Sequence, residues 1–172
     1  SCYDSPLTHG PMLGAIESDL ARVWVRSAST RQTSIRVSAT LAGLASAAPV
    51  AYAYPDSSRD MTHVFEVQGL TPQTTYHYAV DVNGSQEGTG SFTTAPAPAS
   101  GTQLSFGFGS CSKFDHQPIF DQIALEDPDA FFFVGDNHYG NTNELSDLRR
   151  YYKWGLEVEN RADLLRDTIT LA

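Results

Sequence analysis

The sequence predicts two fold classes in one chain: an N-terminal β-sandwich, followed by the beginning of an α/β domain. Short segments that alternate apolar and polar residues fill the first half, as half-buried strands do. After residue 102, a segment with helical spacing lies between two apolar segments of strand length, which indicates a βαβ unit. Residues 95–102, rich in Pro and Ala, separate the two patterns and predict a semi-rigid linker.

Alternating segments predict the strands of the sandwich, which we assign to residues 1–94. They are residues 21–26, 34–38, 63–67, 75–82 and 91–94. Several short strands at this spacing are typical of a β-sandwich. Trp24 lies on the first of these segments, and we expect it in the core.

The segment Gly69–Tyr76 indicates the kind of sandwich. Pro72 begins a turn just before a strand, and the Tyr76 hydroxyl is placed to hydrogen-bond back to that turn. This is the layout of a tyrosine corner, and it resembles the fibronectin type III sandwich, in which leucine, proline and tyrosine recur at this spacing. Tyr76 is therefore expected to be structural rather than catalytic.

Residues 103–172 predict the first part of an α/β domain. The expected elements are a strand at 103–109, a helix at 118–125, a strand at 130–134, helices at 144–156 and 162–166, and a strand from 168 onward. The run 130–134 is apolar throughout, as in a parallel strand buried on both faces. Thr142 or Asn143 is expected to cap the longer helix. Because two or three strands cannot close a large core, we expect this domain to be incomplete.

Composition narrows the possible partners. The chain has 20 acidic and 11 basic residues and a formal charge of −9, which argues against nucleic-acid binding. No apolar run approaches the roughly 20 residues that a membrane-spanning helix needs. Cys2, close to the first residue, is a candidate site for a lipid anchor.

Polar residues follow both predicted parallel strands. Ser110-Cys111-Ser112 comes after the first strand, and the segment 135–141 comes after the second. Because the carboxyl ends of parallel strands meet at one edge of a sheet, these loops are expected to lie side by side.

The second loop carries chemistry that suits a metal ion. Asp136 directly follows a buried strand, so it needs a cation, hydrogen bonds or a proton. A phenol has a pKa near 10, so Tyr139 becomes a charged ligand only beside a strong Lewis acid such as a trivalent metal. The Cys111 thiolate can complete the site, and His138 is a candidate proton shuttle. The simpler alternatives are a small apolar cysteine, a turn-capping aspartate and a packed tyrosine.

Two motifs together resemble known families. Gly135-Asp136-x-x-Tyr139 matches the block that supplies ferric ligands in purple acid phosphatases. With the preceding sandwich and the Gly109–Ser112 loop, the chain is similar to the PhoD-like alkaline phosphatase/phosphodiesterase family, whose catalytic core is a calcineurin-like metallophosphoesterase α/β sandwich.

The resemblance implies a site and an activity. Cys111 matches the cysteine ligand of iron, Asp136 the aspartate that ligates and bridges the metals, and Tyr139 the phenolate ligand. Asp136 and His138 are the candidate catalytic residues. The implied cofactors are Fe(III) and Ca²⁺, with other divalent metals left open. The implied reaction is hydrolysis of phosphate mono- or diesters by a metal-activated water, in an extracytoplasmic enzyme.

The chain departs from that family in two ways. Gly140-Asn141 stands where an acidic residue is common. The family's later ligand block, a Trp-Asp-Asp-His-Asp run, is expected directly after a strand such as residues 169–172, where this sequence ends. We therefore expect the chain alone to be inactive. The alternative is a non-catalytic β-sandwich binding module with a degenerate α/β remnant. A third interpretation is a metallophosphoesterase-fold protein that acts on another ester.

Overall fold

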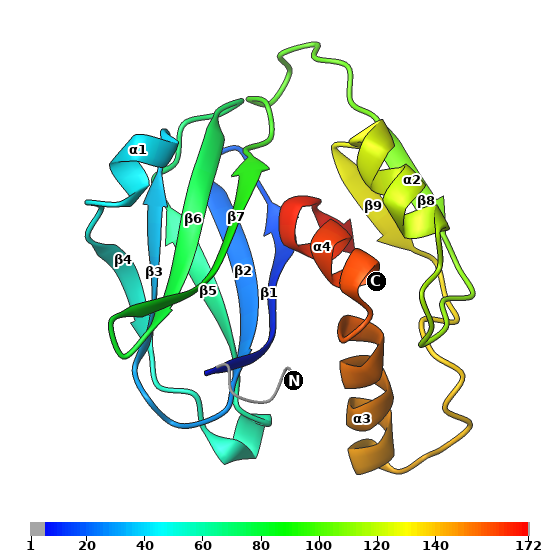
Figure 1. Cartoon of the computed structure of the whole chain (residues 1–172). Coiled ribbons are helices and arrows are strands. Elements are labelled where there is room, and N and C mark those ends of the chain that lie inside the picture. Colours follow the sequence, from blue (N-terminus) through cyan, green and yellow to red (C-terminus); the bar gives the residue numbers. More distant parts are fainter. Residues whose placement is uncertain (1–5, 172) are drawn as a thin grey trace.

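The computed structural model describes residues 6–171, which form a β-sandwich beside a small parallel sheet with helices (Figure 1). Cys2 and its predicted lipid anchor lie outside the described residues. Within residues 6–171, no helix has the length and apolar character needed to cross a membrane.

Two antiparallel sheets make the sandwich. One has the order β1-β2-β5 and the other the order β4-β3-β6-β7. Their bounds are β1 Leu7–Ile16, β2 Leu20–Ser27, β3 Thr33–Ser38, β4 Pro49–Ala53, β5 Thr62–Gln68, β6 Thr75–Val82 and β7 Ser85–Thr93. A short helix, α1 (Leu41–Leu44), and a 3₁₀ turn, η1 (Ser57–Arg59), lie in the connections.

Alternation along β2 decides which side chains enter the core. Val23 and Val25 are fully buried between the sheets, together with Ile35 and Tyr78 from the opposite sheet. Successive strand residues point to opposite faces, so Trp24 lies on the outer face and is only half-buried. The expectation that Trp24 belongs to the core was wrong.

The tyrosine corner is confirmed. The Thr71 N–H donates to Tyr76 Oη at 3.0 Å, and the Tyr76 ring stacks on Phe92 with centroids 5.8 Å apart. The hydroxyl thereby fixes the turn that leads into β6.

The α/β part contains the predicted elements in the predicted order. They are β8 (Phe106–Gly109), α2 (Ile119–Glu126), β9 (Ala130–Phe133), α3 (Leu145–Leu156), α4 (Glu159–Asp167) and β10 (Thr170–Leu171). The strands are parallel in the order β10-β9-β8. A small core of three phenylalanines and two leucines joins the sheet to α2 and α4: Phe120, Phe131, Phe133, Leu164 and Leu165.

Several boundaries differ from expectation. The strand predicted at 103–109 begins at Phe106, and the strand predicted at 91–94 is the end of β7, which begins at Ser85. The helix expected at 162–166 begins at Glu159, before the apolar pair Leu164-Leu165. The N-cap of α3 is Glu144, whose side chain makes no capping hydrogen bond. Thr142, one of the expected caps, instead accepts the Glu144 N–H at 3.1 Å, which orders the residues just before the helix.

Helix α4 lies between the sandwich and the parallel sheet (Figure 1). Tyr78 Oη in β6 donates to the Arg166 carbonyl at 2.8 Å, and Thr170 Oγ1 donates to the Leu13 carbonyl at 3.0 Å. Met12 of β1 packs against the smaller core, and Ile169 packs against the sandwich core. The two parts therefore share an interface of apolar contacts and hydrogen bonds.

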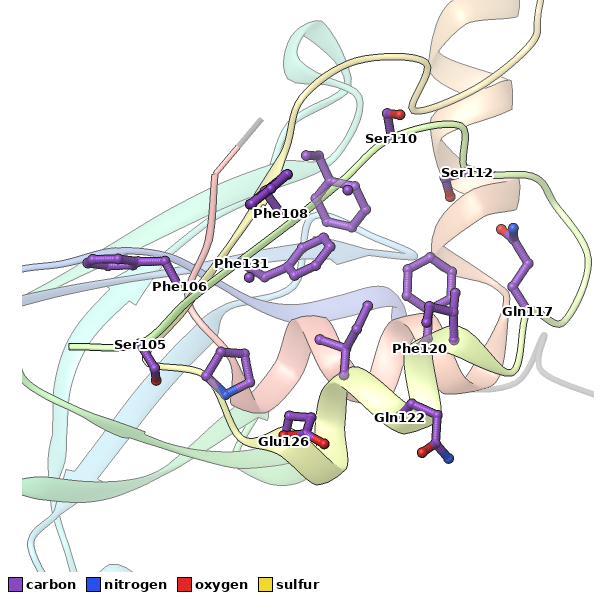
Figure 2. Close-up of a pocket in the computed structure, with 16 residues that line it drawn as sticks. Ser105, Phe106, Phe108, Ser110, Ser112, Gln117, Phe120, Gln122, Glu126 and Phe131 are labelled. Atoms are coloured by element: carbon purple, nitrogen blue, oxygen red, sulfur yellow. The ribbon is translucent and has the colours of Figure 1, made fainter.

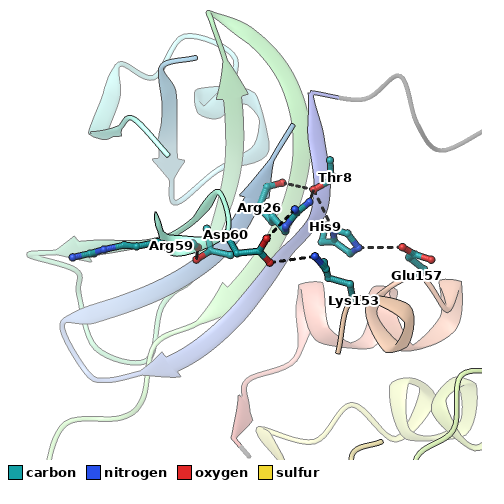
Figure 3. Close-up of polar contacts among 8 residues, drawn as sticks. Thr8, His9, Arg26, Arg59, Asp60, Lys153 and Glu157 are labelled. Carbon is teal, nitrogen blue, oxygen red and sulfur yellow. Dashed lines mark hydrogen bonds and ion pairs between the residues drawn. The ribbon is translucent and has the colours of Figure 1, made fainter. Parts of the chain in front are cut away.

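Polar contacts extend this interface to α3 (Figure 3). Asp60 pairs with Arg26 at 3.2 Å and with Lys153 of α3 at 3.3 Å. His9 Nε2 lies 3.3 Å from Glu157 Oε1, just beyond the end of α3. Burial alone would raise the pKa of Asp60, but the hydrogen bonds and charges of Arg26 and Lys153 outweigh it and lower that pKa.

Candidate metal centre

Backbone hydrogen bonds hold together the two loops that follow β8 and β9. The Val134 N–H donates to the Gly109 carbonyl at 2.9 Å, where the parallel ladder ends. Beyond the ladder, the Cys111 N–H donates to the Gly135 carbonyl at 3.3 Å. The Ser112 N–H donates to the Asp136 carbonyl at 2.9 Å. The predicted side-by-side placement of these loops is therefore observed, and it follows from the parallel pairing of the strands.

Both loops contain residues in the left-handed backbone region. Cys111 has φ 64° and Asp136 has φ 48°, while Gly135 has φ 125°, where only glycine is relaxed. A left-handed cysteine is strained, since only Gly and, less often, Asn or Asp adopt this region readily. Strain of this kind clusters at functional sites, where the surrounding structure holds it in place.

The side chains of Cys111, Asp136 and Tyr139 converge at this edge. The Cys111 thiol donates to Asp136 Oδ2 at 3.8 Å. Its sulfur also lies 3.4 Å from Ser110 Oγ, in a hydrogen bond in which either group can be the donor. Hydrogen bonding with Cys111 is the main cause that raises the pKa of Tyr139 to about 12. Slight desolvation and the negative charges of Cys111 and Asp136 raise it further. All three side chains are exposed at the surface.

The donor set fits a trivalent metal ion. A thiol, a carboxyl and a phenol become three negative ligands when deprotonated, and only a strongly charged cation offsets their mutual repulsion. The pKa of Tyr139 is raised mainly by its hydrogen bond with Cys111, and the negative charges of Cys111 and Asp136 contribute to the same shift. No group of three or more His, Cys, Asp or Glu side chains within residues 6–171 is arranged to hold a metal. The trio therefore depends on the phenol as its third donor.

His138 occupies a different position from the trio. Its ring stacks on Tyr151 at 5.9 Å and meets Tyr152 edge-on at 4.7 Å, both in α3. Its Nδ1 accepts the Gly140 N–H at 3.2 Å, which is its one side-chain hydrogen bond among residues 6–171. These contacts fix the loop against α3, and a proton-transfer role for His138 stays a prediction.

An apolar groove lies next to the loops, between β8 and α2 (Figure 2). Its volume is about 450 Å³, and aromatic and aliphatic side chains such as Phe108, Phe131 and Ile123 line most of it. Ser110 and Ser112 stand at one end of it, whereas Cys111, Asp136 and Tyr139 do not line it. The candidate metal centre and the apolar groove are therefore adjacent but separate features.

Sequence reasoning missed one charged residue near the centre. Arg161 of α4 is buried, and its Nη1 donates to Ser112 Oγ at 2.7 Å, directly beside Cys111. An arginine on a polar helix normally faces water, so the sequence carried no signal for this contact.

Comparison with known proteins identifies the relatives of the chain. Residues 2–96 match the family model described as "PhoD-like phosphatase, N-terminal domain". A solved structure of PhoD superposes with a TM-score of 0.75 at 19% identity, over 93% of this chain. The chain spans 37% of the length of that PhoD chain.

Other solved structures match more weakly. A sensor domain of the anti-sigma factor RsgI4 of Pseudobacteroides cellulosolvens matches with a TM-score of 0.44 at 14% identity, over 58% of this chain and 81% of that one. The fn3 domain of human contactin 1 matches with a TM-score of 0.41 at 18% identity, over 60% and 90%. No curated protein matches the chain.

The family model covers more than half of the chain, and the structural match to PhoD covers 93% of it. This chain belongs to the PhoD-like phosphatase family.

Proposed function

We propose that this chain is the N-terminal portion of a metal-dependent phosphoesterase that hydrolyses phosphate mono- or diesters. The observation that carries the proposal is the convergence of Cys111, Asp136 and Tyr139 at the paired ends of β8 and β9. Membership of a phosphatase family supports the reaction class. The parallel sheet with its helices then represents the start of a calcineurin-like metallophosphoesterase domain. We place the domain bounds at 1–94 and 103–172, with the linker between them.

Each residue of the trio has a separate part in this proposal. Asp136 provides carboxylate oxygens, which suit Fe(III) and Ca²⁺ alike. Cys111 and Tyr139 provide a thiolate and a phenolate, which favour the ferric ion. A cation bound there would supply the Lewis acidity that activates water and offsets charge on the phosphoester. Cys111 and Asp136 both have left-handed backbone, and their side chains approach each other at this exposed edge.

The natural full-length protein provides the direct test. Purified and loaded with Fe(III) and Ca²⁺, it should hydrolyse p-nitrophenyl phosphate or bis(p-nitrophenyl) phosphate. Asp136→Asn should reduce the rate at least tenfold, because it removes a charged ligand. His77→Asn, a change on the sandwich strand β6, is the matched control and should leave the rate unchanged. A metal-loaded protein that cleaves neither compound would contradict the proposal and favour a non-catalytic binding module.

We further propose an extracytoplasmic location, on the basis of the family resemblance alone. Cell fractionation followed by immunoblotting tests it, and recovery of the protein only in the cytoplasmic fraction would contradict it.

A further inference from the structure

Arg161 is a buried cation beneath the candidate metal centre. Only 5% of its surface is exposed, and Nη1 donates to Ser112 Oγ, which is itself 3% exposed. Nε has no hydrogen-bond partner among the described residues. The guanidinium lies 5.1 Å from the ring centre of Phe133 and 6.0 Å from that of Phe120. Burial lowers the pKa of Arg161, so the surroundings oppose its charge. Placing a guanidinium here is costly, and within residues 6–171 no ion pair offsets that cost.

The neighbouring helix makes room for this side chain. A Cβ on Gly155 of α3 would lie 2.7 Å from Arg161 Nη1, so a larger residue there would displace the guanidinium. Glycine weakens a helix interior relative to alanine. Two locally unfavourable features, the buried charge of Arg161 and the glycine at position 155 of a helix, together allow Arg161 Nη1 to reach Ser112 Oγ.

Ser112 makes one of the two backbone hydrogen bonds that join the loops beyond the strand ladder. Its N–H donates to the Asp136 carbonyl at 2.9 Å, and it directly follows the strained Cys111. Strained backbone persists only where the surroundings hold it in place. The hydrogen bond from Arg161 therefore acts at the point that connects the backbone of Cys111 with that of Asp136.

We propose that Arg161 is a positioning residue for the metal centre. Through Ser112 it holds the turn at residues 110–112 and thereby sets how Cys111 and Asp136 face each other. The identity of the ion rests on the proposed function, whereas the ordering of the two loops does not depend on it.

The test replaces both partners of the hydrogen bond. In Arg161→Met/Ser112→Ala, apolar side chains take both places, so no buried polar group is left unpaired and the chain should fold. Arg161→Lys keeps one donor and should rescue part of the effect. Arg166→Met is the matched control on the same helix, since the Arg166 side chain pairs with Asp163 and Asp167 at the surface.

Three measurements are made on the full chain. Amide hydrogen exchange without metal should quicken at residues 110–112 and 135–137 in the double variant and stay unchanged in Arg166→Met. Titration with Fe(III) alone should show affinity about 10–100-fold weaker, the usual effect of losing a group that orients a ligand. The thermal unfolding midpoint of the double variant should not fall, because an apolar pair replaces an uncompensated charge.

The outcomes separate this proposal from the proposed function. A chain that takes up no Fe(III) contradicts the metal centre, while the exchange at the two loops still decides the role of Arg161. Unchanged exchange at both loops in the double variant overturns the positioning role. A lower unfolding midpoint with faster exchange throughout the core also overturns it, because that pattern indicates a purely structural residue.

Discussion

The substitution Tyr78→Phe tests whether the sandwich and the α/β part form one cooperative unit. Tyr78 is fully buried in β6, and its hydroxyl donates to the Arg166 carbonyl in α4 at 2.8 Å. Burial raises the pKa of Tyr78 above its usual value, so the hydroxyl stays neutral and keeps its proton for this bond. The two residues are 88 positions apart, so the bond spans the interface between the two parts.

The size of the effect follows from the geometry of that contact. The substitution removes one hydrogen bond and leaves the partly buried Arg166 carbonyl without its donor. An unpaired buried polar group costs about 1–3 kcal/mol, so we expect the free energy of unfolding to fall by about 2 kcal/mol. For a chain of this length, that is a fall of about 4–8 °C in the thermal unfolding midpoint, followed by circular dichroism.

Tyr76→Phe is the matched control on the same strand. Tyr76 Oη accepts the Thr71 N–H at an exposed turn, where water can replace the lost partner. We expect a loss of about 1 kcal/mol. If Tyr78→Phe costs no more than Tyr76→Phe, or if two separate unfolding transitions appear, the shared interface does not stabilise the molecule as argued.

Two further predictions concern the polar contacts in Figure 3. Burial lowers the pKa of His9, the charges of Arg26 and Lys153 add to this, and the hydrogen bond to Glu157 opposes it. The neutral ring therefore stabilises the fold above about pH 6.5, and this stability is lost as pH falls through the lower folded pKa. In His9→Gln, the thermal unfolding midpoint should therefore fall less steeply as the pH is lowered, and an equally steep fall would contradict this. Burial also lowers the pKa of His63, so His63→Gln measures the contribution of that histidine separately. Asp60→Asn should cost about 1 kcal/mol in urea unfolding, because it removes a charge shared by Arg26 and Lys153 while asparagine still tolerates φ 53°. Lys153→Met removes only one of those two ion pairs, so it should lower the free energy of unfolding by less than Asp60→Asn does. An equal or larger loss would contradict the claim that Asp60 stabilises the fold through both pairs.

Periodicity in the sequence predicted the strands that alternate cleanly. β2, β3, β5 and β6 lie where alternation placed them. β1 escaped notice because Gly10, Pro11 and Gly14 interrupt its pattern, and its pairing with β2 contains register shifts. β4 is an edge strand that begins at Pro49, and all five of its residues are apolar, so its sequence shows no apolar–polar alternation.

Only those parts of the candidate centre that depend on the pairing of neighbouring strands could be predicted from the sequence. Cys111 and Asp136 meet because parallel strands end at a common edge, which sequence order alone implies. Arg161 contacts a loop from α4, and Tyr78 contacts α4 from β6; such contacts depend on tertiary packing that no local pattern encodes. Trp24 was wrongly expected in the core, because its position in the alternation of β2, opposite in face to Val23 and Val25, places it outside.

Titration of the chain with Fe(III), followed by visible absorption, tests the central claim most directly. If Cys111, Asp136 and Tyr139 hold one ferric ion, a phenolate-to-iron absorption band should grow with added metal. It should vanish in Tyr139→Phe and persist in Tyr151→Phe, whose ring stacks on His138 and Phe114 instead. A band that survives in Tyr139→Phe, or no band in the unmodified chain, would contradict the assignment of these three side chains to one metal centre.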